Sequence, residues 1–305
     1  MKTGFLSDKY GVALVAIFCS VLWGSAFPVL KVTYQEMAIL PGDYGSRIIL
    51  AAMRFMLAGI ALLVLVRFGM KSSFKVERRY WPAVVVSGIL QISLQYFFFY
   101  NGLANTTGMK GAVLQSCCTF FVVIFAHLFL QNDKLNWKKG FGLVTGFGGI
   151  ILVNWGQKFN LEFSLAGEGF LILAGIASAA AMIQAKNLTQ NINAFALTGW
   201  QMVIGSAFLF CAGFLTKGTV VLDLTPLAGG LLIYSAFLSA ASFSLWYAIL
   251  KYNKAGEIEI YRFMIPVSGA LLSAFFIPGE DLNIMMIGAL FMVAVGIFAV
   301  NRSPQ

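Results

Sequence analysis

Two arginines lie inside long apolar stretches of the sequence, where a charged side chain is costly and is by default a functional candidate. Arg54 interrupts one stretch, and Arg262 stands three positions after Glu259, a spacing that brings the two side chains together on a helix. A guanidinium recognises carboxylates and phosphates through paired hydrogen bonds. Arg54 is thus a candidate for anion recognition or for a clamp between helices. Glu259 and Arg262 are candidates for a gate or substrate contact, or for an interfacial pair whose charges reach water.

Amide, hydroxyl and aromatic side chains form two further stripes. Gln91 and Gln95 share a helix face with Ser87 because the three residues are four positions apart. Since an amide that faces lipid leaves its hydrogen bonds unmade, this stripe must face protein or water. Hydrogen bonding between helices and the lining of a cavity both remain open. The second stripe combines serines with aromatic residues that can stack on apolar or cationic groups: Ser235, Ser239, Ser242, Trp246 and Tyr247.

The cysteines and carboxylates do not support redox or metal chemistry. All four cysteines lie in apolar stretches without metal-ligand spacing: Cys19, Cys117, Cys118 and Cys211. We therefore expect no metal and no cofactor. We also find no carboxylate deep in any apolar stretch, and this leaves coupling to an ion open.

Catalytic residues are also scarce. A membrane enzyme that acts on lipid-linked substrates would need a nucleophile–base pair or a carboxylate cluster near one interface. Only His127 and Glu259 approach that description, and nothing in the sequence orients them. We therefore expect no enzyme activity. His127, the only histidine, is a candidate proton shuttle or simply a solvated side chain.

The stretches that carry these residues are long enough to cross a membrane. Hydrophobic residues make up 59% of the 305 positions and charged residues 11%, whereas a soluble domain carries about 25% charged residues. Continuous apolar runs fit helices, since a barrel strand would alternate. The sequence therefore predicts an all-α integral membrane protein with ten transmembrane helices, at residues 11–31, 47–66, 81–100, 109–130, 138–155, 167–186, 195–215, 227–249, 258–277 and 284–300.

The basic residues predict the orientation of these spans. Most of the 21 Lys and Arg residues lie on the side of the N-terminus, with a dense group from Arg67 to Arg79. Because basic loops stay in the cytosol, both termini should be cytoplasmic in a cell (plasma or inner) membrane. The net charge of +9 is thus a topology signal and does not indicate a nucleic-acid partner. The partners we expect are the lipid bilayer and a small-molecule substrate.

An internal repeat appears when the second half of the chain is shifted by 147 positions. Asp133 then meets Glu280, and Gln115 meets Arg262. We predict two five-helix repeats, residues 1–157 and 158–305. Since five crossings return the chain on the opposite side, the second repeat is inverted. Inverted repeats are typical of secondary transporters that work by alternating access, with the substrate site near the midplane.

Three segments resemble the EamA type of the drug/metabolite transporter superfamily. They are LWGSAFP at 22–28 in the first span, AAMRF at 51–55 in the second, and YRFMIPVSG at 261–269 in the ninth, followed by PGE at 278–280. The sequence departs from the family pattern in the fourth span. Thr119 and Asn132-Asp133 stand where the family usually has a proline and a Gly-Glu pair.

The resemblance covers nearly the whole chain and implies a carrier of small polar metabolites, often an exporter. It also implies a central cavity lined mainly by spans 1, 3, 4, 6, 8 and 9. The second span usually lies outside that cavity, which favours the clamp role for Arg54. With Arg54 and Glu259 as gating or structural residues, the candidate substrate-binding residues are Trp23, Gln91, Gln95, Gln115, Ser239, Ser242, Trp246, Tyr247 and Arg262.

The predicted function is export of a small amino-acid-like or zwitterionic metabolite by alternating access. The arginines favour a substrate that carries a carboxylate. The alternative is a multidrug or organic-cation exporter that relies on aromatic faces. The fifth and tenth spans are glycine-rich, and Gly142 and Gly146 form a Gly-xxx-Gly face. This face predicts close helix packing and a candidate homodimer contact through spans five and ten.

Overall fold

The computed structural model describes residues 4–40, 42–106, 108–154, 163–217, 224–277 and 284–301, and the regular structure in these ranges is helical. The longer α-helices are α1 (Lys9–Glu36), α2 (Tyr44–Val64), α5 (Gly108–Phe129), α6 (Trp137–Val153), α7 (Phe170–Leu188), α8 (Ala194–Lys217), α9 (Pro226–Tyr252) and α12 (Ile284–Asn301). The third span is assembled from η2 (Arg78–Tyr80), α3 (Trp81–Gly88), the π-helical turn η3 (Ile89–Leu94) and α4 (Gln95–Ala104). The ninth is assembled from α10 (Ala255–Ile258), the 3-10 turn η5 (Glu259–Phe263) and α11 (Met264–Phe276). Two π-helical turns, η1 (Leu65–Gly69) and η4 (Leu165–Gly169), adjoin α2 and α7.

Each predicted apolar run coincides with one of these helical segments, within a few residues at either end. Among the described residues, seven helices are long and apolar enough to cross a membrane, and Leu114–Phe129 and Ile284–Val300 are shorter apolar helices. A helix satisfies its own backbone hydrogen bonds in lipid, which explains why these sequences adopt it. The chain is therefore an all-helical, multi-pass membrane protein.

Side-chain caps fix where several helices begin. Asp8 accepts from the backbone N–H of Tyr10 at 3.1 Å and of Gly11 at 3.2 Å at the start of α1. At the start of α9, Thr225 accepts from Ala228 N at 3.1 Å, one residue before a proline. A proline at the first helical position costs no hydrogen bond, because the backbone N–H of any residue at that position has no partner within the helix.

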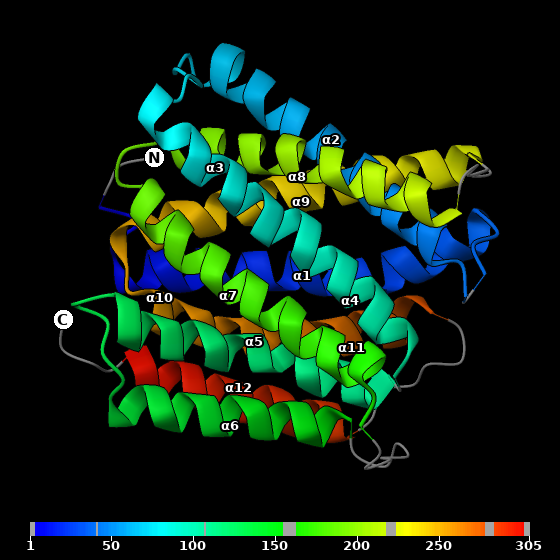
Figure 1. The fold of residues 1–305 in the computed structure, drawn as a ribbon. Helices are drawn as coiled ribbons and strands as arrows, with labels where there is room; N and C mark the ends of the chain where they lie inside the picture. Colours follow the sequence, from blue (N-terminus) through cyan, green and yellow to red (C-terminus); the bar gives the residue numbers. More distant parts are fainter. Residues whose placement is uncertain are drawn as a thin grey trace.

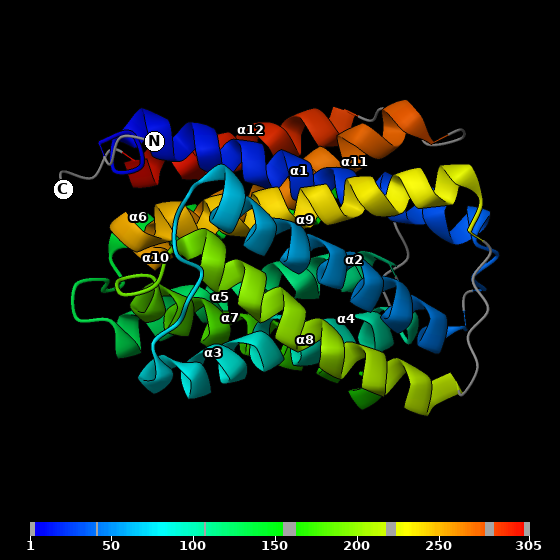
Figure 2. The same cartoon turned by 90° about the horizontal axis from the view of Figure 1, so that it is seen from above.

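The bundle has a helix pair at each of two opposite edges. α6 lies beside α12 at one edge, and α2 lies beside α8 at the other (Figure 1). Between the edges, α1 packs on α9 and α11, while α7 packs on α4 and α5. Seen at right angles, α2 and α8 run obliquely beside α9 and contact it (Figure 2). The beginning of α1 and the end of α12 lie at the same end of the bundle (Figure 1).

Glycines allow close contacts within the chain. A Cβ at Gly24 of α1 would lie 2.9 Å from the backbone N of Gly269 in α11, so only glycine fits there. Similarly, a Cβ at Gly142 of α6 would lie 2.8 Å from Val300 of α12. The close helix packing that was predicted for the Gly142 face is therefore a contact between α6 and α12 of the same chain.

Candidate substrate site

A buried ion pair lies at the start of the ninth span. Arg262 Nη1 donates to Glu259 Oε1 at 2.8 Å, and both residues belong to the tight 3-10 turn η5. The Glu259 side chain is 0% exposed and that of Arg262 is 11% exposed. The prediction that the two residues pair is confirmed. The Glu259 carboxylate does not reach water, because its side chain is fully buried where η5 packs against α1, α5, α6, α11 and α12.

The sequence did not show how completely Glu259 is buried near the start of its span. The helical segment that crosses here begins at Ala255 and not at the predicted residue 258. Glu259 therefore lies inside the span and one turn below its beginning. The sequence did not indicate that the helical segment begins before residue 258, because the polar residues on both sides of Gly256 are typical of a loop.

Aromatic side chains form a wall beside the ion pair. The Arg262 guanidinium lies 5.3 Å from the Trp23 ring centroid, a cation–π contact between η5 and α1. The Trp23 ring packs against Trp246 at 5.3 Å and against Phe243 at 5.1 Å, both on α9. Trp23 and Trp246 were predicted from the sequence, whereas Phe243 was not singled out among the many apolar residues.

Polar contacts connect the ion pair to the third span. Arg262 Nη1 lies 3.9 Å from Cys118 Sγ of α5, and Cys118 interacts in turn with Ser178 of α7. Gln91 Nε2 donates to Ser178 Oγ at 3.4 Å. Tyr247 OH donates to Gln91 Oε1 at 3.1 Å, so that α9 also contributes to this polar cluster. The cluster consists of Glu259, Arg262, Cys118, Ser178, Gln91 and Tyr247.

Gln91 also donates to Gln95 within the third span. Gln91 lies in the π-helical turn η3, and Gln95 begins α4 directly after it. Such turns are rare and often occur at functional sites, because they redirect side chains within a helix. The sequence predicted this glutamine stripe but not the turn that orients it.

Several buried polar atoms in this region have no hydrogen-bond partner among the described residues. They include Glu259 Oε2, Trp246 Nε1 and Ser242 Oγ. Unpaired buried groups are uncommon because each one costs free energy. A polar substrate or water would provide the missing partners. Glu259, Trp246 and Ser242 were all candidates from the sequence.

Three predicted residues, Arg54, Ser239 and Gln115, lie outside this cluster. Arg54 Nε donates to Ser239 Oγ at 2.5 Å, linking α2 to α9, and its guanidinium lies 5.0 Å from the Phe55 ring. Ser239 is thereby engaged with Arg54. Gln115 is half-buried on α5, and no hydrogen bond between described residues joins it to the cluster.

The sequence analysis missed Cys118 and Ser178, which link the ion pair to Gln91. From the sequence, Cys118 was considered only for redox and metal chemistry, neither of which its spacing supports. One available signal was its position three residues after Gln115, on the same face of α5. Ser178 stands alone in a run of alanines, so periodicity offered no signal for it.

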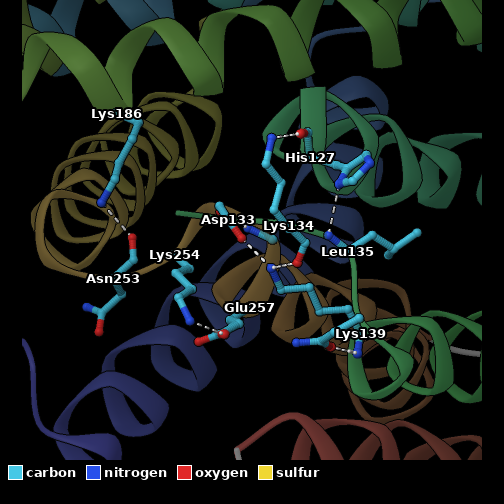
Figure 3. A network of polar contacts seen from close by, with 11 residues as sticks. His127, Asp133, Lys134, Leu135, Lys139, Lys186, Asn253, Lys254 and Glu257 are labelled. Carbon is cyan, nitrogen blue, oxygen red and sulfur yellow. Dashed lines mark hydrogen bonds and ion pairs between the residues drawn. The ribbon is translucent and has the colours of Figure 1, made fainter. Parts of the chain in front are cut away.

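A second polar network closes the end of the bundle where the chain begins (Figure 3). Lys139 of α6 forms an ion pair with Asp133, and both side chains are buried. Asp133 Oδ2 also accepts from the backbone N of Gly256 at 2.9 Å, just before η5. The sequence did not single out Lys139 or Asp133 as buried residues, and both are covered by α10.

Lys186 completes this network at the end of α7. Its Nζ donates to Leu250 O and Asn253 O, each at 2.6 Å, and so binds the carbonyl end of α9 (Figure 3). A cation is favourable there because the helix dipole is negative at that end. A surface hollow of about 600 Å³ lies beside Lys186.

The remaining chemistry of the described residues is limited. His127 Nδ1 accepts from Leu135 N at 3.1 Å, which ties the exposed hairpin between α5 and α6 (Figure 3). Within the described ranges, no group of three or more His, Cys, Asp or Glu could hold a metal ion.

Known proteins resemble this chain along its whole length. The EamA-like transporter family matches it twice, over residues 11–155 and 165–302. An uncharacterized transporter of Bacillus subtilis (strain 168), YvbV, is 25% identical, with 97% of this chain and 93% of that protein covered. A WAT1-related chloroplastic protein of Arabidopsis thaliana is 23% identical, with 98% and 72% covered.

A solved crystal structure has the same fold. It superimposes with a TM-score of 0.79 at 15% sequence identity, covering 96% of each chain. The family match includes both halves of the sequence and all the helices that build the polar cluster. The chain therefore belongs to the EamA-like transporter family.

Proposed function

We propose that this protein is a secondary transporter for a small zwitterionic metabolite, and that Arg262 binds the carboxylate of that substrate. The observation that carries this proposal is the buried Arg262–Glu259 pair beside an aromatic wall. Ten crossings, two inverted repeats and cytoplasmic termini in the cell membrane belong to the same proposal. Net export is expected where the substrate accumulates in the cytosol.

Corresponding contacts in the two halves support the inverted repeat. A Cβ at Gly24 would meet Ile265 and Ser268 of α11. A Cβ at Gly175 of α7 would meet Cys118 and Phe121 of α5, which stand 147 positions before Ile265 and Ser268. Two symmetry-related halves can exchange conformations, and this exchange is the basis of alternating access.

Burial favours a carboxylate over a cation as the recognised group. The Glu259 side chain is fully covered, whereas the Arg262 side chain is 11% exposed and its guanidinium contacts the Trp23 ring. A substrate that enters the cluster would therefore reach the guanidinium before the carboxylate. The indole of Trp246 and the hydroxyl of Ser242 offer a donor and a hydroxyl without partners for its other polar groups. The aromatic wall favours an apolar side chain on the substrate.

The rival function is export of organic cations. The wall of Trp23, Phe243 and Trp246 favours this rival because aromatic faces attract cations. A cation would, however, have Arg262 as its nearest charge, and like charges repel.

Counterflow in proteoliposomes tests the proposal. Leucine, leucinamide and choline are compared as labelled probes: a zwitterion, its analogue without the carboxylate, and a quaternary amine. We expect counterflow of leucine to exceed that of both other probes. A preference for leucinamide or choline would reject the carboxylate proposal and support the cation exporter.

A further inference from the structure

Glu259 and Arg262 are buried to different degrees, although they form one ion pair. The carboxylate is 0% exposed, and its Oε1 accepts from Arg262. Its other oxygen, Oε2, has no hydrogen-bond partner among the described residues. The Arg262 side chain is 11% exposed, and its guanidinium contacts Trp23 and Cys118. The arginine can thus change partners, whereas the carboxylate has no second partner of its own.

We propose that Glu259 couples transport to protons: it binds a proton when the substrate carboxylate takes its place on Arg262, and loses the proton when the Arg262–Glu259 pair forms again. This inference rests on the proposed function, because it assigns the substrate carboxylate to Arg262. It adds a co-transported ion to that function.

The physical reason is the cost of an isolated buried charge. A carboxylate in a low-dielectric interior is tolerated when it is paired, and it becomes neutral when its partner leaves. Arg262 is the charged partner of Glu259 on its own turn. When a substrate occupies the guanidinium, the free energy of the site is lowest with a protonated Glu259.

The proton can be followed through one cycle, in which each zwitterion and its proton together carry one positive charge. In the empty site, one guanidinium faces one carboxylate. In the loaded site, the guanidinium faces the substrate carboxylate, and the proton on Glu259 comes from water on the side to which the site is open. When the substrate leaves, Glu259 returns to Arg262 and the proton goes to the water on that side. Substrate and proton therefore move in the same direction, so that an exported molecule carries a proton out of the cell.

None of the described groups around Glu259 offers a second positive charge that could replace Arg262 as the partner of the carboxylate. Cys118 of α5 and Tyr247 of α9 are the titratable groups that face the pair, and both are neutral near pH 7 in their ordinary form. Tyr96 of α4 faces Arg262. The side of α6 that faces η5 presents Gly142 and Gly146, and α1 contributes Ser20 and Trp23. Lys139, whose amine lies beside Gly256 in the turn before Glu259, is already paired with Asp133.

Proton uptake by the detergent-solubilised wild-type protein is the direct test. Leucine is added in weakly buffered solution at pH 7, and a pH indicator follows the change while labelled leucine reports binding. We expect about one proton to be bound per leucine, because one carboxylate loses its partner. Binding of leucine without proton uptake would overturn the proposal, since it would mean that the leucine ammonium has replaced Arg262.

Variants locate the proton. Glu259→Asp should keep the proton uptake, whereas Glu259→Gln should bind leucine without it. Glu257→Gln is a matched control, since this neighbouring carboxylate pairs with Lys254 at 3.2 Å and is partly exposed. Glu257→Gln should behave as wild type. Proton uptake that persists in Glu259→Gln would overturn the proposal.

Transport measurements separate this inference from the proposed function. Proteoliposomes that contain an internal pH dye should acidify inside during inward leucine flux, and an inward proton gradient should accelerate that flux. Leucine counterflow without any proton movement would reject the coupling and leave the proposed function standing. If the wild-type protein prefers leucinamide or choline, the proposed function fails, and the coupling fails with it.

Discussion

Arg54 and Gln201 stand 147 positions apart in the sequence, and each donates to a serine of a neighbouring helix. Arg54 Nε donates to Ser239 Oγ of α9 at 2.5 Å, and Gln201 of α8 donates to Ser87 Oγ of α3. All four side chains are buried. A charged clamp in one half thus corresponds to a neutral clamp in the other, at the edge where α2 meets α8.

The clamp role predicts a loss of stability and not of selectivity. Arg54→Ala should lower the free energy of unfolding by about 1.5–3 kcal/mol, because a buried hydrogen bond from a charged group is lost. Gln201→Ala, the matched change in the other half, should cost about 1 kcal/mol. Thermal unfolding in detergent measures both effects. If Arg54→Ala were as stable as wild type but had lost counterflow of leucine alone, Arg54 would be a recognition residue.

The buried Lys139–Asp133 pair predicts a second stability effect. Asp133→Asn leaves the Lys139 charge buried without its partner and should cost about 3–5 kcal/mol. The double variant Asp133→Leu/Lys139→Met removes both charges and should be closer to wild type than either single variant. Thermal unfolding of the singles and the double tests this order. A double variant that is less stable than both singles would contradict it.

The aromatic wall and the glutamine pair predict a loss of transport in folded protein. Gln95→Ala and Trp246→Ala should each reduce leucine counterflow several-fold, because they remove polar or aromatic contacts of the cluster. Trp137→Ala is the control, since Trp137 is 74% exposed at the start of α6. Size-exclusion chromatography in detergent confirms that each variant is folded. Unchanged counterflow in both test variants would place the substrate elsewhere.

The orientation is tested by labelling. In a variant without native cysteines, Ser73→Cys in the basic 67–80 segment should react with an impermeant reagent only after the cells are opened. Gly42→Cys, an exposed position beyond the opposite end of α1, should react in intact cells. The reverse pattern would contradict cytoplasmic termini.

The sequence allowed the helices and part of the site to be predicted, because both depend on regular patterns. Long apolar runs predict helices, and the four-residue spacing of Gln91 and Gln95 predicts a shared face. The three-residue spacing of Glu259 and Arg262 predicts their ion pair, which the structure contains.

What the sequence could not show depends on contacts between distant helices. Burial of Glu259, Asp133 and Lys139 results from the packing of α10 and η5 against α5 and α6. Charged residues close together in the sequence look like an exposed loop when the covering helix lies more than a hundred positions away. The link through Cys118 and Ser178 likewise joins isolated residues from two helices, and neither residue belongs to a periodic pattern.

The central claim is that Arg262 recognises the substrate carboxylate, and the most direct measurement is the counterflow ratio of leucine to leucinamide in Arg262 variants. Arg262→Gln removes the charge, while Arg262→Lys keeps a charge but loses the paired hydrogen bonds. Arg79→Gln at an exposed position is the control. We expect a ratio well above one for wild type and Arg79→Gln, an intermediate ratio for Arg262→Lys, and a ratio near one for Arg262→Gln. An unchanged ratio in folded Arg262→Gln would contradict the claim.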